Sequence, residues 1–392
     1  MKVSIVINCF RYAAFVGQAV RSALAQTWPD TEVIAVDDGS TDGSREAILA
    51  CGPRVRTVFK DNGGQGSAYN AGFAAASGDL VLFLDADDWL YPDAAERVAS
   101  AWRPGLSKVQ FQLDVVDAEG RPMGRHLPGE MHDSDALVLL TRFGSYGTPP
   151  GSGNVYSAEF LRQVLPMDEP RWRIAADSVP VLLAPVHGQV LSLHLALGAY
   201  RVHRRGDTGS AAGSSPQALL FNNAPKGLWS EFARVRRCQE LVAEHLERHG
   251  HPVARPLLLA PWDARLAALC LRFGGAGGEE QEAAAFATAA ADPLTAPGSS
   301  PSAARPTPDA TAPVPSAARV APDAVAAPGT LRTLGSPLAH RALRSLWQWP
   351  RLGPGMKLLQ SLWMLSLWLL PKSLARPIAR LDRYFRGARS AG

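Results

Sequence analysis

Residues 80–89, LVLFLDADDW, place a run of apolar side chains directly before a cluster of carboxylates. The run Leu80 to Leu84 is typical of a strand that is buried on both faces. Asp85, Asp87 and Asp88 follow at its end, where crowded carboxylates repel one another and lose hydration. A partner must compensate these charges, so we interpret this strand end as part of a functional site.

Strand and helix patterns alternate around this stretch. We expect strands at 2–8, 31–38, 54–60 and 80–85, and helices at 15–27, 41–50, 66–78 and 92–102. Such units predict an α/β fold with a mainly parallel sheet flanked by helices. Ligands bind such sheets at the carboxyl ends of the strands, where Asp37 and Asp38 also lie.

The rest of the chain is less regular. It predicts strands at 107–117 and 189–203, helices at 134–143 and 157–165, and a helical region at about 215–275. We divide the chain into a catalytic domain (1–210), a helical extension (211–282), a linker (283–335) and a tail (336–392). The linker is rich in Ala and Pro with almost no large apolar side chains, a composition typical of disorder.

The bulk composition excludes several classes of protein. Apolar residues make up 46% and charged residues 19% of the 392 residues, which is ordinary for a globular protein. The four cysteines show no CxxC spacing, so neither a zinc site nor a disulfide framework is expected. The start, MKVSIVINCF, reads as a first strand and not as a signal peptide, so we expect a cytoplasmic protein.

The charge is concentrated at the C-terminus. Residues 341–392 carry ten Lys or Arg against one acid, a net +9, which leaves the first 340 residues at −5 within the overall +4. A mildly acidic body with a basic end is unlike a nucleic-acid-binding domain. It indicates an electrostatic tether to an anionic surface.

The tail is also rich in Trp, at positions 347, 349, 363 and 368. Its apolar stretch, residues 358–370, is too short to span a hydrocarbon core of about 30 Å as a helix. Aromatic side chains beside a basic stripe favour a helix in the membrane interface, peripheral on the cytoplasmic face of the inner membrane. The alternative is a helical hairpin packed on the catalytic body, with the Trp residues in its core.

The three aspartates at the strand end suit a hard cation. Mg²⁺ and Mn²⁺ take one or two carboxylates together with phosphate oxygens of a substrate. Such a cation supplies the positive charge that a diphosphate leaving group needs. A helix cap at Asp88 or Asp93 is the alternative for those two residues, but it does not explain Asp85.

Three ordered motifs carry a resemblance to a known family. Residues 3–44, which end in VIAVDDGSTDGS, and residues 62–89 closely resemble the family 2 glycosyltransferases, which have the GT-A nucleotide-sugar-binding fold. The resemblance implies an inverting enzyme that moves a sugar from a nucleotide-diphosphate sugar, in the first place a UDP-sugar. The acceptor would be a hydroxyl of a glycan or a lipid-linked molecule in cell-surface polysaccharide synthesis.

The resemblance also assigns roles to residues. Asp38 would accept a hydrogen bond from the imide N–H of uracil, and Phe10 would stack on the base. Asp85 would bind the ribose or the metal's water shell, and Asp87 would bind Mn²⁺ or Mg²⁺ directly. Asn70 would contact the donor.

The family pattern is altered at several positions of the donor site. Arg11 stands where the family usually has Asn, and Tyr69 stands where it often has Arg, so the contacts to the diphosphate are not assigned. Gly63, Gly64 and Gly66 would let the backbone approach the donor closely, or form a plain turn.

An inverting transfer needs a general base for the acceptor hydroxyl. By resemblance the base is Asp177 in WRIAADSVPVLLA, where Ala176 replaces the first acid of the family's pair. The alternative is that Asp177 only caps the following helix. In YRVHRRGDTGS, His203 would reach the metal or the diphosphate, unless it is structural. Arg201, Arg204 and Arg205 would pair with phosphates.

Two other classes of protein stay open at this point. One is an inactive sugar-nucleotide-binding scaffold, and the other is a sugar-phosphate nucleotidyltransferase, although NCFRYAAFVG is not the phosphate loop which that class requires. A processive synthase is disfavoured because residue 168 is Asp where the QxxRW element needs Gln. We therefore expect a single sugar addition.

Overall fold

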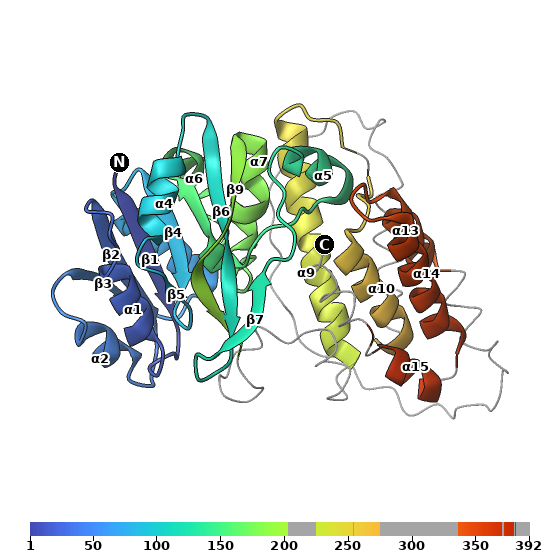
Figure 1. The fold of residues 1–392 in the computed structure, drawn as a ribbon, viewed down its shortest axis with the longest axis horizontal. Coiled ribbons are helices and arrows are strands. Elements are labelled where there is room, and N and C mark those ends of the chain that lie inside the picture. The colour runs from blue at the N-terminus through green and yellow to red at the C-terminus, as the bar shows by residue number, and fades with distance from the viewer. Residues whose placement is uncertain (203–224, 254, 275–335, 371, 380, 382–392) are drawn as a thin grey trace, which may run out of the picture.

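The computed structural model describes residues 1–202, 225–253, 255–274, 336–370, 372–379 and 381. In Figure 1 a central sheet has helices packed against it, and a group of helices from the C-terminal part lies beside β6 and β7. This arrangement confirms the expected α/β class with a helical C-terminal region. The expected linker and the boundary at 210 lie outside the described residues, so the four-part division stays a prediction.

The sheet has nine strands in the order β3-β2-β1-β4-β8-β6-β9-β5, with β7 paired to β6. The strands are β1 Val3–Cys9, β2 Thr31–Asp38, β3 Val55–Lys60, β4 Leu80–Asp85, β5 Trp89–Leu90, β6 Leu106–Val116, β7 Pro122–Leu127, β8 Asn154–Ser157 and β9 Gln189–Arg201. The first four strands in this order are parallel, and Asn8 of β1 lies opposite Asp85 of β4. Their carboxyl ends therefore meet at one edge of the sheet.

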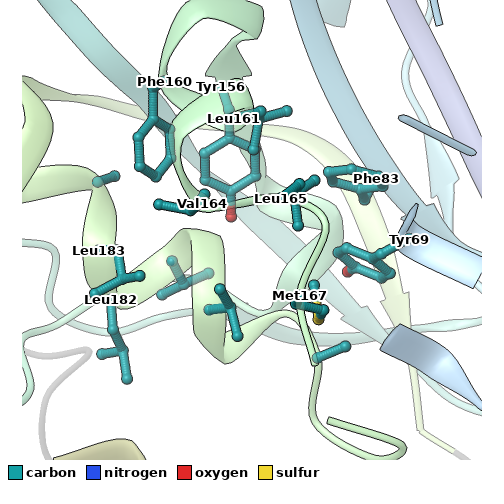
Figure 2. Packing of buried hydrophobic residues seen from close by; sticks show 14 of the residues in the cluster. Tyr69, Phe83, Tyr156, Phe160, Leu161, Val164, Leu165, Met167, Leu182 and Leu183 are labelled. Atoms are coloured by element: carbon teal, nitrogen blue, oxygen red, sulfur yellow. The ribbon is translucent and has the colours of Figure 1, made fainter. Parts of the chain in front are cut away.

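Helices cover both faces of this sheet. They are α1 Val16–Leu24, α2 Ser44–Leu49, α3 Gln65–Ala75, α4 Ala94–Ala101, α5 Ala136–Phe143, α6 Ala158–Val164 and α7 Ser178–His187. The alternation of β1 explains the two layers, because Ile5 and Ile7 pack with α1 and α4 whereas Val6 packs on the opposite face with α3. Figure 2 shows the second layer, in which Tyr69 stacks on Phe83 with ring centroids 4.1 Å apart.

Short elements between residues 120 and 157 depart from the sequence-based expectation. The residues directly before the helix expected at 157–165 form a 3-10 turn, η1 Gly151–Gly153, and strand β8. β8 runs antiparallel between β4 and β6, so the sheet is mixed and becomes parallel again only between β6 and β9. Strands of two to four residues carry too little periodicity to be found in a sequence.

The C-terminal helices form a third core. They are α9 Pro225–Arg248, α10 Pro261–Phe273, α13 Pro337–Gln348, α14 Pro354–Leu369 and α15 Lys372–Ala379. Trp363 and Trp368 are buried in this core. Trp349 lies in the core of the catalytic body, where its ring contacts Phe143 at 4.7 Å. These three Trp residues thus occupy core positions, which is the second of the two alternatives for the tail.

Further contacts fix these helices to the body. The Trp349 ring also meets Trp262 of α10 at 5.3 Å, and the Arg351 guanidinium pairs with Asp135 at 2.8 Å. In the parts of the chain that the structure describes, no helix has both the length and the apolar character needed to cross a membrane.

Candidate functional site

The aspartates that end β4 divide into two groups. The backbone turns at once after the strand, with Asp88 N–H donating to the Asp85 carbonyl at 3.1 Å. Asp88 is buried, and its carboxylate accepts from the Ser152 hydroxyl at 2.6 Å and from the Arg201 backbone N–H at 2.9 Å. Asp88 therefore has a structural role within the protein, whereas Asp85 and Asp87 remain partly exposed.

Arg201, at the end of β9, does not present a phosphate-binding guanidinium. Its Nε donates to the Asp87 carbonyl at 3.0 Å, and its two terminal nitrogens donate to the Ala118 carbonyl and to Gln18 Oε1, each at 2.7 Å. The predicted phosphate contact of Arg201 is thus replaced by a structural role, because its donors fix the turn that carries Asp87. Residues 203–205, one His and two Arg, lie outside the described residues, and their contacts with the metal or the phosphates stay predictions.

The candidate base Asp177 lies close to Asp85, although 92 positions separate them in the sequence. Gly151 of η1 marks the place where they converge. A methyl group added there would lie 3.4 Å from Asp177 Cβ, 3.4 Å from Tyr69 Oη and 3.7 Å from Asp85 Oδ2. One acid from β4 and one from the start of α7 thus face the same small space.

Asp177 occupies the position before α7, but its side chain makes no capping hydrogen bond. One reason is that Pro180, three residues on, has no N–H to donate. The backbone N–H groups of Ser178 and of Asp177 itself still favour the charged carboxylate, against the burial that raises its pKa, so the role of Asp177 as the base stays a prediction. Two residues earlier, Ala175 has φ of +60°, a strained conformation for a residue with a side chain, of the kind that clusters at functional sites.

Burial and mutual repulsion disfavour the charged forms of these acids. Burial, then the charge of Asp87, then that of Asp177 raise the pKa of Asp85. Burial also raises the pKa of Asp177, an effect that the nearby Arg234 guanidinium opposes. The site therefore holds negative charge that its own residues compensate only in part.

The segment that carries Asp177 is tied to the first turns of α3. Gln65 and Gly66 donate their backbone N–H groups to the carbonyls of Arg173 and Trp172, at 2.9 and 3.0 Å. Gly64 and Gly66 are needed for this approach, because a Cβ on either would lie within 2.8 Å of Arg173 or Trp172. These two glycines thus allow close packing against residues 172–173. The sequence had suggested either close approach to the sugar donor or a plain turn.

Asn70 takes part in the same attachment. Its amide nitrogen donates to the Met167 carbonyl at 2.9 Å, and its oxygen accepts from the Met167 N–H at 2.9 Å. A second donor contact reaches Glu169 at 3.1 Å. Asn70 thus holds the segment before Asp177, and its contact with a donor stays a prediction.

Asp38, the predicted partner of the base, lies at the end of β2. One carboxylate oxygen accepts from Lys60 Nζ at 2.6 Å and from Gly63 N–H at 2.9 Å. The other accepts from Asn62 Nδ2 at 3.0 Å and from Gly64 N–H at 2.7 Å. A base that binds Asp38 must exchange one of these donors, so the assignment stays a prediction. Phe10, at the end of β1, is 41% exposed, as a stacking platform requires.

The carboxylates at the end of β4 are candidate ligands for a divalent cation. Among the described residues, no group of three or more His, Cys, Asp or Glu side chains is placed to hold a metal ion. Asp85 and Asp87 supply two partly exposed carboxylates at the strand end. This fits Mg²⁺ or Mn²⁺, which take one or two protein carboxylates and complete their shell with water and phosphate oxygens.

The sequence analysis missed the residues that hold η1 in place. Lys108 is fully buried in β6, and its amine donates to Thr148 Oγ1 at 2.9 Å and to Asn154 Oδ1 at 3.0 Å. Asn154 in turn donates to the Pro150 carbonyl at 2.8 Å. Burial lowers the pKa of Lys108 well below its usual value. A Lys near the start of a strand with several large apolar side chains was the signal that pointed to this support.

Comparison with known proteins gives several related matches. The family described as glycosyl transferase family 2 matches residues 4–165. An uncharacterized glycosyltransferase of Nostoc sp. is 36% identical over 224 residues, which cover 55% of this chain and 70% of the relative. The succinoglycan biosynthesis protein ExoO of Rhizobium meliloti is 36% identical over 140 residues, or 35% of this chain and 40% of ExoO.

A solved structure is also similar. The crystal structure of S. aureus TarS 1-349 in complex with UDP-GlcNAc aligns with a TM-score of 0.44 and 18% identity, covering 71% of this chain and 83% of that chain.

Proposed function

The chain belongs to glycosyltransferase family 2, and we propose that it adds a single sugar from a nucleotide-diphosphate sugar, in the first place a UDP-sugar, to an acceptor hydroxyl. The acceptor is a glycan or a lipid-linked molecule in cell-surface polysaccharide synthesis, a setting supported by the name of ExoO. We place the enzyme on the cytoplasmic face of the membrane. Membership of the family decides against the nucleotidyltransferase that the sequence left open.

One observation carries the proposal, the meeting of Asp85 and Asp177 around Gly151. Inverting transfer requires a donor site and a base on opposite sides of one reacting carbon. Asp85 stands at the donor end of the sheet, and Asp177 approaches from α7 without a capping bond. Asp85, Asp177 and the Tyr69 hydroxyl all lie within 3.7 Å of the place that a side chain on Gly151 would occupy, which supports a joint role for the two acids.

In this mechanism Asp177 accepts the proton of the acceptor hydroxyl. The hydroxyl oxygen bonds to the anomeric carbon while the bond from that carbon to the diphosphate breaks, and the nucleoside diphosphate leaves. Burial raises the pKa of Asp177, which makes its carboxylate a better proton acceptor at neutral pH. Asp85 and Asp87 would hold Mg²⁺ or Mn²⁺, which supplies positive charge for the leaving diphosphate.

Donor binding is proposed for the edge formed by β1 and β2. Phe10 stacks on the base through its exposed ring, and Asp38 accepts from the base once one of its present donors has moved. Tyr69 places a hydroxyl near Asp85, at the position where the family often has Arg. A neutral phenol there cannot neutralise a diphosphate, so more of that task falls to the cation.

The test is release of nucleoside diphosphate from a panel of nucleotide sugars, with Mn²⁺, with Mg²⁺ and with a chelator. We expect metal-dependent release from at least one donor, and a decrease of roughly 10²- to 10⁴-fold in kcat for Asp177→Asn. Asp87→Ala should abolish the response to metal. Asp30→Asn is the matched control, since Asp30 is exposed and precedes β2, at the opposite end of the strand from Asp37 and Asp38.

The same variants separate an enzyme from an inactive scaffold. If Asp177→Asn retains donor binding by thermal shift while turnover falls, the base assignment stands. Donor binding without any metal-dependent hydrolysis or transfer in the unaltered chain would contradict the proposal and favour the scaffold.

A further inference from the structure

Helix α14 is apolar on two opposite faces. One face packs inward through Trp363, Met364, Leu367 and Trp368. The other turns outward, where Leu358, Leu359, Leu362 and Leu369 are 43–52% exposed. A surface helix normally carries polar side chains on its outer face, so this outer face is built for something other than water.

The next segment extends this surface. Trp363 Nε1 donates to the Ile378 carbonyl at 2.8 Å, which holds α15 against α14. Ala375 and Ala379 of α15 face inward, whereas Leu374 and Leu381 are 55% and 53% exposed. We call the six outward side chains at positions 358, 359, 362, 369, 374 and 381 the leucine face.

The charged side chains in the segment that carries the leucine face are all basic. The described residues between 336 and 381 include no Asp or Glu, whereas Arg344, Arg351, Lys357 and Arg376 lie among them. The Arg351 guanidinium is used by Asp135, but Arg344 and Arg376 are exposed. Exposed leucines within a purely cationic segment match an apolar layer covered by anionic headgroups.

Two other occupants fit less well. In a second copy of the chain, contact through the same face would bring like charges together, which is unfavourable. The region at 283–335 has almost no large apolar side chains with which to cover leucines. At 16 residues α14 is about 24 Å long, shorter than a hydrocarbon core of about 30 Å, so it suits a position along a bilayer and not across it.

We infer that the leucine face is the surface by which this protein docks on an anionic bilayer. This inference gives the membrane attachment in the proposed function its location. Within it Trp363 and Trp368 fix the helices to the protein while the leucines face the lipid, and Trp347, 50% exposed, is not buried with them. Figure 1 shows α13, α14 and α15 on the side of the molecule far from β2 and β3.

The test is co-sedimentation of the full chain with vesicles of phosphatidylcholine, alone and mixed with phosphatidylglycerol. We expect binding to the mixed vesicles that weakens with salt. The double variant Leu358→Gln/Leu362→Gln should bind roughly tenfold more weakly, since two half-exposed leucines lose their transfer into lipid. Arg344→Glu/Arg376→Glu should also bind more weakly and lose most of the salt dependence.

Matched controls are available on the same chain. Leu49→Gln and Leu195→Gln change leucines that are 58% and 50% exposed but lie outside the leucine face, and they should bind as the unaltered chain does. Because the altered leucines are exposed, near-unchanged thermal unfolding is expected and excludes misfolding as a cause. Nucleotide release measured without vesicles reports the catalytic site separately.

Two results would overturn the inference. One is vesicle binding that the leucine variants leave intact. The other is a concentration-dependent dimer in solution that Leu358→Gln/Leu362→Gln dissolves, which would show that the leucine face joins two copies. Loss of activity with vesicle binding retained would contradict the proposed catalysis and leave the docking surface standing.

Discussion

The sheet edge at Asp85 is a charged surface and the outer side of α14 is an apolar one, yet both are unfavourable in water. At the edge, carboxylates are crowded and partly buried, so that burial and repulsion raise the pKa of Asp85. On α14, leucines that belong in an interior are half exposed. Each arrangement would become favourable with the partner that we propose for it: a cation with a diphosphate in one case, and a lipid layer in the other.

The largest expected effect contrasts the two faces of the tail. Trp349→Ala should lower the free energy of unfolding by about 3–5 kcal/mol, because a buried ring in contact with Phe143 and Trp262 leaves a cavity. Leu362→Ala should change it by less than about 0.5 kcal/mol. Urea denaturation of both variants checks the contrast, and equal losses would show that the leucine face is part of the fold.

The next largest effect concerns the stability of the protein and its response to a metal ion at the sheet edge. Mn²⁺ at about 100 times its dissociation constant should stabilise the protein by about 2.7 kcal/mol, if it binds only the folded state. Asp85→Asn should make the metal-free protein more stable at neutral pH, because burial, and then repulsion by Asp87 and Asp177, raise the pKa of Asp85 to about 8 and so favour the unfolded chain, in which it ionises freely. It should also remove most of the response to Mn²⁺.

Thermal unfolding measures the metal-free stability and its response to Mn²⁺. The proteins compared are the unaltered chain, Asp85→Asn and the control Glu159→Gln. A metal-free Asp85→Asn protein that is less stable than the unaltered chain would show that Asp85 has a compensating partner within the protein.

A smaller effect tests the spacing of the two carboxylates. Gly151→Ala would place a methyl group 3.4 Å from Asp177 Cβ and 3.4 Å from Tyr69 Oη, close enough to fill the space without a severe clash. We expect roughly a tenfold decrease in kcat/KM with little change in stability, since a small displacement of reacting groups is costly. Unchanged kinetics would place the reacting atoms elsewhere.

The smallest effect is a dependence of stability on pH at the contact of α7 with α9. Burial, then the neighbouring His249, His245 and Arg248, lower the pKa of His187 to about 4. The unfolded chain therefore binds this proton first, at its usual pKa of about 6.5. The contribution is complete above about pH 6.5 and is lost as the pH falls towards 4.

Comparison of the unaltered chain with His187→Gln isolates this effect, because Asp85 and Asp177, whose pKa values are raised, act in the opposite direction in both proteins. A pH profile that His187→Gln leaves unchanged would remove His187 as its source.

The first hundred residues were predictable because their signals are local and periodic. Strands β1 to β4 and helices α1 to α4 appear at the expected positions, and the class of reaction followed from motifs in the same region. The segment between 120 and 157 was not predictable to the same degree. β8 is only four residues long, and η1 is held by Lys108 from a distant strand.

The roles of single residues were also predictable only in part. The sequence offered Asp88 a structural role as a helix cap, whereas its carboxylate accepts from Ser152 and Arg201, which are distant in the sequence. Arg201 was assigned to a phosphate by resemblance, and the structure gives its guanidinium structural partners. For the tail the sequence left two alternatives open, and Trp363 and Trp368 lie in a core, as one of them states. Which side of an apolar helix faces inward cannot be read from its sequence when both sides are apolar.

The attachment of residues 172–173 to α3 has a consequence for how such enzymes diversify. Its hydrogen bonds join main-chain atoms, so they place no demand on most side chains of the loop that leads to Asp177. Ile174, 64% exposed in this loop, can therefore be exchanged without disturbing these main-chain bonds. Substitutions at position 174 are expected to alter the exposed surface of the loop while its attachment to α3 is kept.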